Sequence, residues 1–326
     1  MQREEELIGI AARYGAEGRQ GDLYGIGDDC AVYPGPGGLS LVTTCDMLCE
    51  GTHFLMEYAT PRELGRKAAA VNVSDVAAMG GEPRWAFVSV GLPEADAAFL
   101  EELYKGMSDC LGPCGAVICG GDTVRSGSIV ISITVTGTAR RPVFRSGARE
   151  GDDILYCGTP GASAAGLGAL TRLGRKAALE RWPEPVKKHL LPEPVTCSPL
   201  IADLAHAMMD ASDGISKDLG AICAASGLGA RLEEELIPLW EPLLEYCRDT
   251  GEDPLRLALA GGEDYGLLVT AAPEDRGRIA DVMKEHGVPC HRLGVMTAGP
   301  AKAELTGRPG GLPEGWQHFT EESPWK

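Results

Sequence analysis

The stretch Lys67–Pro83 places polar side chains inside an apolar run, and it constrains the fold more than any other segment. Its sequence is KAAAVNVSDVAAMGGEP, in which alanines and valines predict a helix that ends at Gly80. Asp75 lies in the middle, and a buried carboxylate is costly unless it is paired. Two interpretations follow. Ser74 or Asp75 caps a helix terminus, or Asp75 binds a metal ion, and this segment alone slightly favours the cap.

Three other stretches set Asp beside Gly next to an apolar run: Gly25–Asp29 (GIGDD), Cys119–Thr123 (CGGDT) and Asp210–Gly214 (DASDG). Glycine permits tight turns and a close approach of backbone to ligand. Carboxylates supply the hard oxygen ligands that Mg²⁺ prefers, usually one or two for each ion together with phosphate oxygens and water. One such motif is a turn, but the recurrence predicts one divided acidic site that holds several Mg²⁺ ions between phosphorylated ligands.

Charge and cysteine content exclude several classes of function. The 326-residue chain has a net charge of −17, which argues against nucleic acid, where a basic surface is expected, and against anionic membranes. A phosphorylated substrate is still compatible if divalent cations lie between it and the protein. Eleven cysteines without a CxxC motif predict free thiols in a reducing cytoplasm. We expect a cytoplasmic protein, because neither a signal peptide nor a membrane span is apparent.

The predicted elements alternate, which indicates an α/β or α+β fold. The first half reads as strands with two long helices; its clearest elements are Leu39–Thr44, Pro61–Ala78, Trp85–Gly91 and Ser128–Thr138. Ala116–Cys119 is predicted to be a short buried strand that delivers Gly120–Thr123. The polar segment Arg140–Asp153 interrupts the apolar pattern. We therefore expect two domains, residues 1–140 and 141–326.

The second half gives weaker signals. Ser198–Met208 is predicted to be a helix, Leu255–Ala260 a strand, and the charged residues 172–195 a surface segment. Gly158–Leu170 reads as a glycine turn into a helix, which can bind phosphate. Neither GxGxxG nor GxxxxGK[ST] occurs in the chain, so NAD-binding and standard phosphate-loop functions are disfavoured.

The residues favour Mg²⁺-dependent chemistry on phosphates without a covalent intermediate. No Ser-His-Asp or Cys-His arrangement is apparent, so we expect no catalytic nucleophile. Phosphoryl transfer needs mainly alignment and charge neutralisation. His53 follows the acidic strand end at Asp46, and it is either a functional residue or an ordinary loop histidine.

Seven motifs resemble those of the thiamine-monophosphate kinase family. They occur in the family's order and cover nearly the whole chain, followed by a GWQHF tail: GIGDDCAV (Gly25–Val32), EGTHF (Glu50–Phe54), NVSDVAAMGGEP (Asn72–Pro83), GGDT (Gly120–Thr123), RSGAREGD (Arg145–Asp152), DASDGISKDL (Asp210–Leu219) and GGEDYGLL (Gly261–Leu268).

The resemblance implies that ATP and thiamine phosphate are converted to ADP and thiamine diphosphate. It implies the fold of aminoimidazole ribonucleotide synthetase, with an N-terminal α/β domain that dimerises through its sheet and a C-terminal α/β sandwich. It also implies a homodimer and a cluster of Mg²⁺ ions between ATP and substrate. The alternatives are another ATP-using synthetase of the same superfamily and a non-catalytic nucleotide-binding regulatory protein.

The resemblance also assigns roles to single residues. The implied metal ligands are Asp29, Thr44, Asp46, Asp75, Asp122, Asp210 and Asp213. The implied ATP contacts are Tyr104, Gly121, Arg145 and Ser212. The implied contacts to thiamine phosphate are His53, Glu263 and Trp316.

Trp316 and Cys45, which lies between the implied ligands Thr44 and Asp46, raise questions of their own. An aromatic face at Trp316 suits a cationic thiazolium ring, although a tail aromatic can also simply cover the core. Cys45 stands where the family usually has a hydroxyl residue, and a thiol is a poor ligand for Mg²⁺. A metal contact at Cys45 must therefore use a backbone oxygen or water, or be absent.

Overall fold

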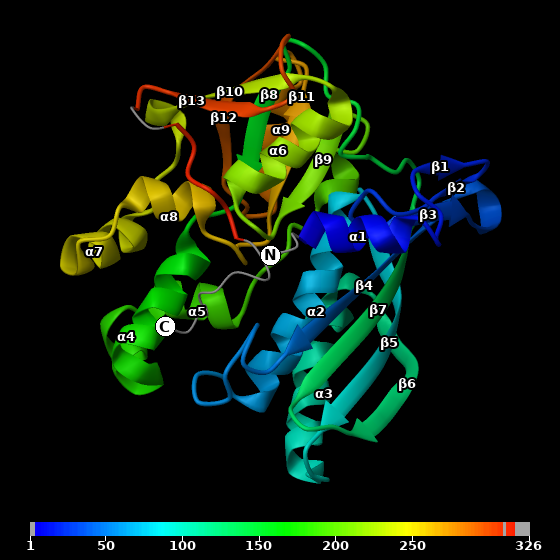
Figure 1. The fold of residues 1–326 in the computed structure, drawn as a ribbon, viewed down its shortest axis with the longest axis vertical. Helices are drawn as coiled ribbons and strands as arrows, with labels where there is room; N and C mark the ends of the chain where they lie inside the picture. The colour runs from blue at the N-terminus through cyan, green and yellow to red at the C-terminus, as the bar shows by residue number, and fades with distance from the viewer. Residues whose placement is uncertain (1–3, 309–310, 317–326) are drawn as a thin grey trace.

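The computed structural model describes residues 4–308 and 311–316 and contains two β-sheets flanked by helices (Figure 1). The first sheet has the order β1 (Arg19–Gln20), β2 (Leu23–Tyr24), β3 (Ala31–Pro34), β4 (Ser40–Cys49), β7 (Val130–Ala139), β5 (Glu82–Leu92) and β6 (Val117–Arg125). The second has the order β13 (Ala303–Thr306), β10 (Gly229–Glu233), β12 (Cys290–Thr297), β8 (Asp153–Cys157), β11 (Gly266–Ala271) and β9 (Ala205–Ala211). Both sheets mix parallel and antiparallel pairs, which confirms the predicted α/β class.

The first sheet buries one face against α2 (Pro61–Ala78) and α3 (Ala97–Leu111). Strand alternation produces this, since residues of β7 such as Ile131 and Ile133 are buried whereas Ser132 and Thr134 face outward. The other face, here called the outer face, exposes large apolar side chains from three strands. They are Met47, Trp85, Phe87, Val117 and Val124.

Helix α2 lies between the two sheets, in contact with β4 and β7 of the first and with β9 of the second. Its bounds are those that the sequence predicted. A capping box of Thr60 and Glu63 starts it, with Pro61 in the first turn, and Gly80 follows its end with φ +66°. Most of its residues are buried, so α2 brings side chains of its apolar run to the junction of the sheets.

Helices α2 and α3 pack at backbone contact through two glycines. A Cβ atom at Gly65 would lie 1.9 Å from the carbonyl oxygen of Leu103, and one at Gly106 would lie 1.9 Å from the carbonyl oxygen of Arg62. Only glycine allows this approach. The crossing therefore fixes the position of α2 from the side opposite the second sheet.

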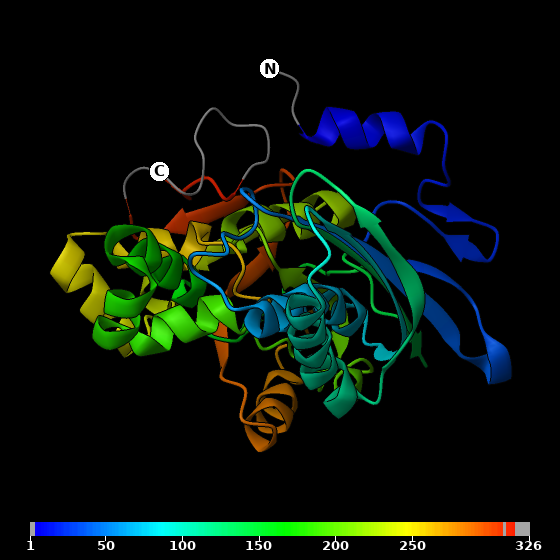
Figure 2. The same ribbon diagram turned by 90° about the horizontal axis from the view of Figure 1, so that it is seen from below.

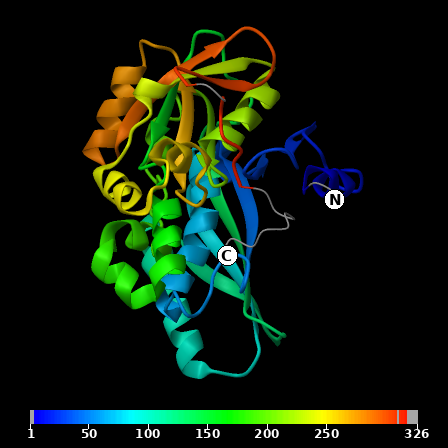
Figure 3. The ribbon, with the colours of Figure 1, turned by 60° about the vertical axis from the view of Figure 1, so that its left-hand side comes forward.

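The second sheet carries helices on both faces (Figures 1 and 2). One face packs in a large core with the helices α4 (Ala162–Arg181), α5 (Pro183–Leu190), α6 (Ile215–Ser226), α7 (Glu241–Thr250) and α8 (Pro254–Ala260). The opposite face packs against α9 (Arg276–Glu285). The N-terminal helix α1 (Glu4–Ala12) stands away from both sheets (Figure 3).

Three predictions for the second half were wrong. The segment Ser198–Met208 forms a short 3-10 turn at Ser198–Leu200 and then enters β9 rather than a helix. Leu255–Ala260 is part of helix α8, which Asp253 caps, because a six-residue apolar run does not reveal its period. Residues 172–195 are not simply a surface segment, since His189 and its neighbours in α5 are buried.

The prediction of a short buried strand at Ala116–Cys119 was also wrong. Strand β6 extends from Val117 to Arg125 and includes the whole GGDT motif. It is exposed because it lies at the edge of the sheet, where β5 is its one partner among the described strands. Apolar composition cannot tell whether a strand is covered by its own chain. Among the described helices, none is long and apolar enough to cross a membrane.

Candidate active site

Four predicted metal ligands from different elements meet where α2 lies between the sheets. Asp29 precedes β3, Asp46 lies on β4, Asp75 on α2 and Asp210 on β9. We call them the carboxylate cluster. The negative charges of Asp46, Asp210 and Asp29 all act on Asp75. The sequence predicted that distant motifs would form one acidic site, and the fold does bring these four residues together.

Hydroxyl and amide groups hold the cluster in place. Thr44 Oγ1 donates to Asp75 Oδ2 at 2.5 Å, and Ser74 Oγ donates to Asp210 Oδ2 at 2.8 Å. The backbone N–H of Asp46 donates to Asn72 Oδ1 at 3.0 Å. Asp75 does not cap α2, because Thr60 is the cap residue. The polar residues of the apolar run therefore face the cluster.

Burial makes the ionised cluster costly. It raises the pKa of Asp29 and Asp75 well above the usual range, and the neighbouring carboxylates raise these pKa values further. Burial likewise raises the pKa of Asp46 to about 6 and that of Asp210 to about 7. At neutral pH the cluster is thus short of positive charge.

The donor set fits Mg²⁺. Asp29 Oδ2 is buried and has no hydrogen-bond partner within the described residues, so a lone pair is available to a cation. Within residues 4–308 and 311–316, no group of three His, Cys, Asp or Glu side chains is arranged to hold a single ion. This agrees with the habit of Mg²⁺, which takes one or two carboxylates and completes its shell with water and phosphate.

Arg145 borders the cluster and neutralises part of its charge. Its Nη2 lies 2.6 Å from Asp29 Oδ1, and its Nε lies 3.3 Å from Asp28 Oδ1. The backbone N–H of Arg145 also donates to Asp28 Oδ2 at 3.0 Å. Asp28, which the sequence did not single out, therefore orients Arg145.

A second group of polar residues surrounds Glu263, just before β11. Lys67 Nζ lies 2.8 Å from Glu263 Oε1 and donates to the carbonyl oxygen of His53 at 3.3 Å. His189 Nδ1 lies 3.5 Å from Glu263 Oε2. We call Lys67, His53, His189 and Glu263 the Glu263 cluster. It joins two of the predicted substrate contacts, His53 and Glu263.

The backbone at Glu263 is strained. Glu263 has φ +64° and Tyr265 has φ +50°, which is a left-handed conformation that side-chain-bearing residues rarely adopt. The N–H of Glu263 donates to the carbonyl oxygen of Ser212 at 2.7 Å, and that of Tyr265 to Ala211 at 3.1 Å. These bonds to the end of β9 hold the strained turn beside the carboxylate cluster.

Trp316 and Asp213 lie next to each other. The N–H of Trp316 donates to the carbonyl oxygen of Asp213 at 3.0 Å, and a Cβ atom at Gly262 would lie 3.7 Å from Trp316 Cβ. Lys217 Nζ lies 2.5 Å from Asp213 Oδ2. Trp316 is thus close to the Glu263 turn. The residues of the GWQHF tail after Trp316 lie outside the described residues.

The two predicted site residues on β6, the metal ligand Asp122 and the ATP contact Gly121, are not brought to the carboxylate cluster. Asp122 pairs with Ser89, so it points to the outer face, whereas Asp46 points to the inner face. Gly121 is required by the fold itself, because a Cβ atom there would lie 1.7 Å from the carbonyl oxygen of Val88. The glycine in this motif therefore has a structural cause besides any contact with ATP.

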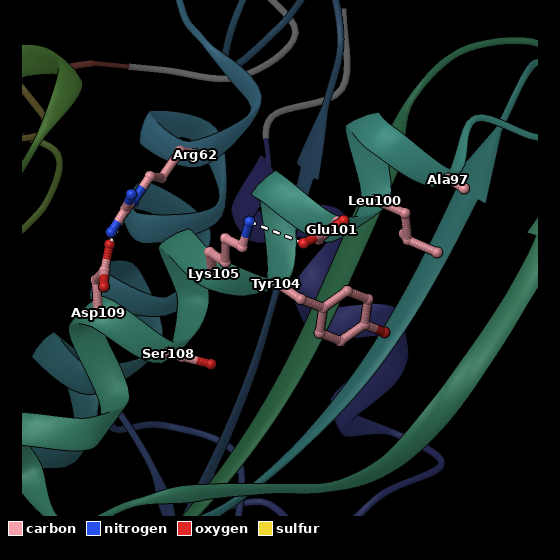
Figure 4. A pocket seen from close by; sticks show the side chains of 8 residues that line it. All are labelled: Arg62, Ala97, Leu100, Glu101, Tyr104, Lys105, Ser108 and Asp109. Atoms are coloured by element: carbon pink, nitrogen blue, oxygen red, sulfur yellow. Dashed lines mark hydrogen bonds and ion pairs between the residues drawn. The ribbon is translucent and has the colours of Figure 1, made fainter.

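Tyr104 lines a surface pocket on α3, with the residues Arg62, Ala97, Leu100, Glu101, Lys105, Ser108 and Asp109. Figure 4 shows Tyr104 on the opposite side of this pocket from the Arg62–Asp109 ion pair. Ser212 lies at the end of β9, between Asp210 and Asp213. The predicted ATP contacts thus fall into two groups, with Arg145 and Ser212 beside the carboxylate cluster and Tyr104 and Gly121 on α3 and β6.

Cys45 points away from the carboxylate cluster. It is exposed, and its Sγ lies 3.6 Å from Ser132 Oγ on the outer face. Thr44 and Asp46, its neighbours on β4, point inward by strand alternation. The thiol of Cys45 therefore does not occupy a ligand position in the carboxylate cluster.

Sequence reasoning missed Lys67 and His189. Lys67 was visible as a single cation at the start of the apolar run, and a buried lysine requires a partner. His189 gave no signal, since it lies within a charged segment. The partner of Lys67 lies 196 positions further along the chain at Glu263, so only the fold reveals the pair.

Comparisons with known proteins agree with this architecture. The family model of the AIR synthase related protein N-terminal domain matches residues 27–139, and that of the C-terminal domain matches residues 149–305. The chain is 39% identical to the thiamine-monophosphate kinase of Escherichia coli over 84% of each chain. It is 38% identical to that of Aquifex aeolicus over 90% of this chain and 92% of the relative.

A solved structure agrees as well. The structure of AaThiL complexed with AMPPCP and TMP superposes with a TM-score of 0.85 at 33% identity and covers 97% of both chains. The fold, the order of the motifs and these relatives lead to the same assignment. The chain belongs to the thiamine-monophosphate kinase family, among the AIR synthase related proteins.

Proposed function

We propose that this chain transfers the γ-phosphoryl group of ATP to thiamine phosphate and releases ADP and thiamine diphosphate. The observation that carries this is the match to AaThiL complexed with an ATP analogue and TMP over 97% of both chains. The test is an assay of the purified protein with ATP, Mg²⁺ and thiamine phosphate. Turnover only with another acceptor would indicate a different ATP-using synthetase. Binding of nucleotide without any turnover would indicate a regulatory protein.

The carboxylate cluster would hold several Mg²⁺ ions. Bound Mg²⁺ neutralises and aligns the phosphate oxygens of both substrates. We assign the ligand role to the four carboxylates of the cluster, with Thr44 and Asp213 as further ligands; the predicted ligand Asp122 points to the outer face and would have to bind an ion there. The unpartnered Oδ2 of Asp29 and the raised pKa values of Asp46 and Asp210 support this assignment.

The two substrates would approach the cluster from different sides. His53, Glu263 and Trp316 would contact thiamine phosphate, which the closeness of all three to the Glu263 turn supports. Arg145 and Ser212 would contact ATP beside the carboxylate cluster, with Tyr104 and Gly121 as further contacts.

Transfer would be direct. No described side chain beside the carboxylate cluster is placed as an activated nucleophile, since Cys45 faces outward and the pKa of Cys30 is raised well above its usual value by burial. A terminal phosphate oxygen of thiamine phosphate would attack the γ-phosphorus in line. Chiral γ-phosphate should therefore be transferred with inversion, whereas retention or a labelled protein would contradict the proposal.

The outer face of the first sheet would join two copies into a homodimer. Phe87 is 49% exposed and Val117 56% exposed on this face, which is unusual for side chains of this kind gathered on one surface. Asp122 lies on the same face, so the dimer would also decide what surrounds it. Phe87→Glu should convert a dimer into a monomer in sedimentation, and a monomeric wild type would contradict this proposal.

We also propose the domain limits 1–140 and 141–326 and a cytoplasmic location. The limit falls between β7, which ends at Ala139, and β8, which begins at Asp153. Eleven free cysteines support a reducing compartment. Expression of the two pieces and fractionation of cells test these assignments.

A further inference from the structure

Lys67 is a buried cation at the junction of the two sheets. Its side chain is 4% exposed, and it stands at the start of the apolar run of α2. Its ammonium group forms an ion pair with Glu263 Oε1 at 2.8 Å and donates to the carbonyl oxygen of His53 at 3.3 Å. Lys67 thus connects a helix on the first sheet to the strained turn before β11 of the second.

Lys67 is also the cation that balances Glu263. Burial together with the charge of Lys67 lowers the pKa of His189 to about 3, so His189 is neutral at physiological pH. Ser163 Oγ lies 2.9 Å from His189 Nδ1 and fixes the ring. Burial alone would raise the pKa of Glu263, but the positive charge of Lys67 and its hydrogen bond outweigh burial and lower that pKa.

Stability does not explain this arrangement. A buried ion pair costs desolvation energy, and apolar residues of similar volume are often at least as stable. The pair instead occupies Glu263 Oε1, whereas Oε2 has only the longer 3.5 Å contact to His189 Nδ1, in a side chain that is still 27% exposed. A small cavity of about 10 Å³ borders Lys67 and His189.

We propose that Lys67 is a positioning residue for recognition of the phosphate acceptor. It holds Glu263 ionised and in one orientation, with Oε2 left to accept a hydrogen bond from an amino group of the acceptor. The inference rests on the proposed function, in which Glu263 contacts thiamine phosphate; the amino group in question is that of the aminopyrimidine ring of this substrate. It adds to that function a residue that supports specificity without contact with ATP.

The first test compares Lys67→Met with Lys67→Arg in steady-state kinetics. Lys67→Met keeps the length of the side chain and removes the charge, and it should raise the KM for thiamine phosphate at least tenfold. The kcat and the KM for ATP should stay within about threefold of wild type. Lys67→Arg should restore most of the lost affinity, because it returns the charge. The exposed Lys302→Met, which loses only a surface ion pair with Glu304, serves as the control.

Three outcomes would overturn the proposal. The first is a Lys67→Met enzyme with a lower melting temperature but an unchanged KM for thiamine phosphate, since that is a purely structural role. The second is an equal rise of both KM values. The third is a Lys67→Arg enzyme no better than Lys67→Met.

A second comparison keeps the proposal testable if Lys67→Met does not fold. Lys67→Met combined with Glu263→Gln removes both charges and leaves no unpaired buried ion. Its KM for thiamine phosphate should equal that of Glu263→Gln alone, because in this proposal Lys67 acts through Glu263 and not through its bond to the carbonyl oxygen of His53. A further rise in the double variant contradicts the proposal. Absence of turnover of thiamine phosphate by the wild type would instead contradict the proposed function.

Discussion

The carboxylate cluster and the Glu263 cluster lie along the same helix, α2, but they balance their charges in opposite ways. Asp75 sits among three other buried carboxylates, and Arg145 offsets only part of their charge. Glu263, in contrast, has Lys67 at 2.8 Å and a neutral His189 on its other side. The protein leaves most of the negative charge of the first cluster unbalanced, whereas the second cluster carries its own cation. Under the proposed function, the first cluster would be the site for phosphates and the second the site for an organic ring.

Removing the bound cations, or a carboxylate that would bind them, should have the largest effect on turnover. EDTA should abolish turnover and Mg²⁺ should restore it. Asp75→Asn should lower kcat on the order of 100-fold or more, because a charged ligand is lost where phosphate charge is neutralised. Steady-state kinetics at saturating substrates measure this.

A matched control separates the cluster from general charge effects. Asp281→Asn on the exposed side of α9 makes the same chemical change and should leave kcat unchanged. Near-normal turnover of Asp75→Asn would mean that the carboxylate cluster is not the metal site.

The next largest effect should be a pH dependence of folding stability that comes from the carboxylate cluster. The raised pKa values of Asp46 (about 6) and Asp210 (about 7) mean that the folded protein keeps protons that the unfolded chain loses from about pH 4. Without metal, the contribution of these two groups to stability is therefore lost as pH rises between about 4 and 7. Each tenfold difference in proton affinity between the folded and unfolded states corresponds to about 1.4 kcal/mol, so the loss should be on the order of a few kcal/mol.

Thermal melts in EDTA and in Mg²⁺ measure this effect. Mg²⁺ favours the ionised carboxylates and should flatten the curve, and Asp210→Asn should reduce the slope in EDTA. If the melting temperature in EDTA rises between about pH 4 and pH 7, the carboxylate cluster does not carry the excess of negative charge that we describe.

Trp316→Ala should have a smaller effect, confined to the Glu263 side. Loss of an aromatic face over a cationic ring should weaken thiamine phosphate by about 1–2 kcal/mol. The KM for ATP should hardly change. An equal shift in both substrates, or in neither, would reduce Trp316 to a packing residue.

Ser74→Ala should have the smallest effect. It removes the hydroxyl that donates to Asp210 Oδ2 at 2.8 Å, and a lost hydrogen bond of this kind costs about 1 kcal/mol of unfolding free energy. Urea unfolding in the presence of Mg²⁺ measures it. A more stable variant would show that Ser74 does not support the cluster.

Local chemistry explains what could be predicted from the sequence. Pro61 and Gly80 mark the ends of α2 because their backbone preferences are nearly independent of context. The Asp–Gly motifs singled out Asp29 and Asp210 and the apolar run singled out Asp75, and the recurrence of such stretches, rather than any one of them, predicted a shared site. The roles assigned from the family resemblance remain predictions.

Non-local packing explains what could not be predicted. The pairing of Lys67 with Glu263 depends on how two sheets meet. The exposure of β6 depends on which strand lies at the edge, and that is decided by long-range pairing. The helix at Leu255–Ala260 is set by the cap at Asp253 and by its neighbours rather than by its own short pattern.

The glycine crossing of α2 and α3 has a consequence for distant mutations. Gly65 and Asp75 are ten residues apart on one rigid helix, about 15 Å along its axis. A single methyl group at residue 65 would meet the backbone of Leu103 and tilt the whole helix. Asp75 and Lys67 would then both move, although neither touches the altered residue. Inactivating variants in a population should therefore include alanine at this position, with every site residue and both sheets present but with Asp75 and Lys67 displaced.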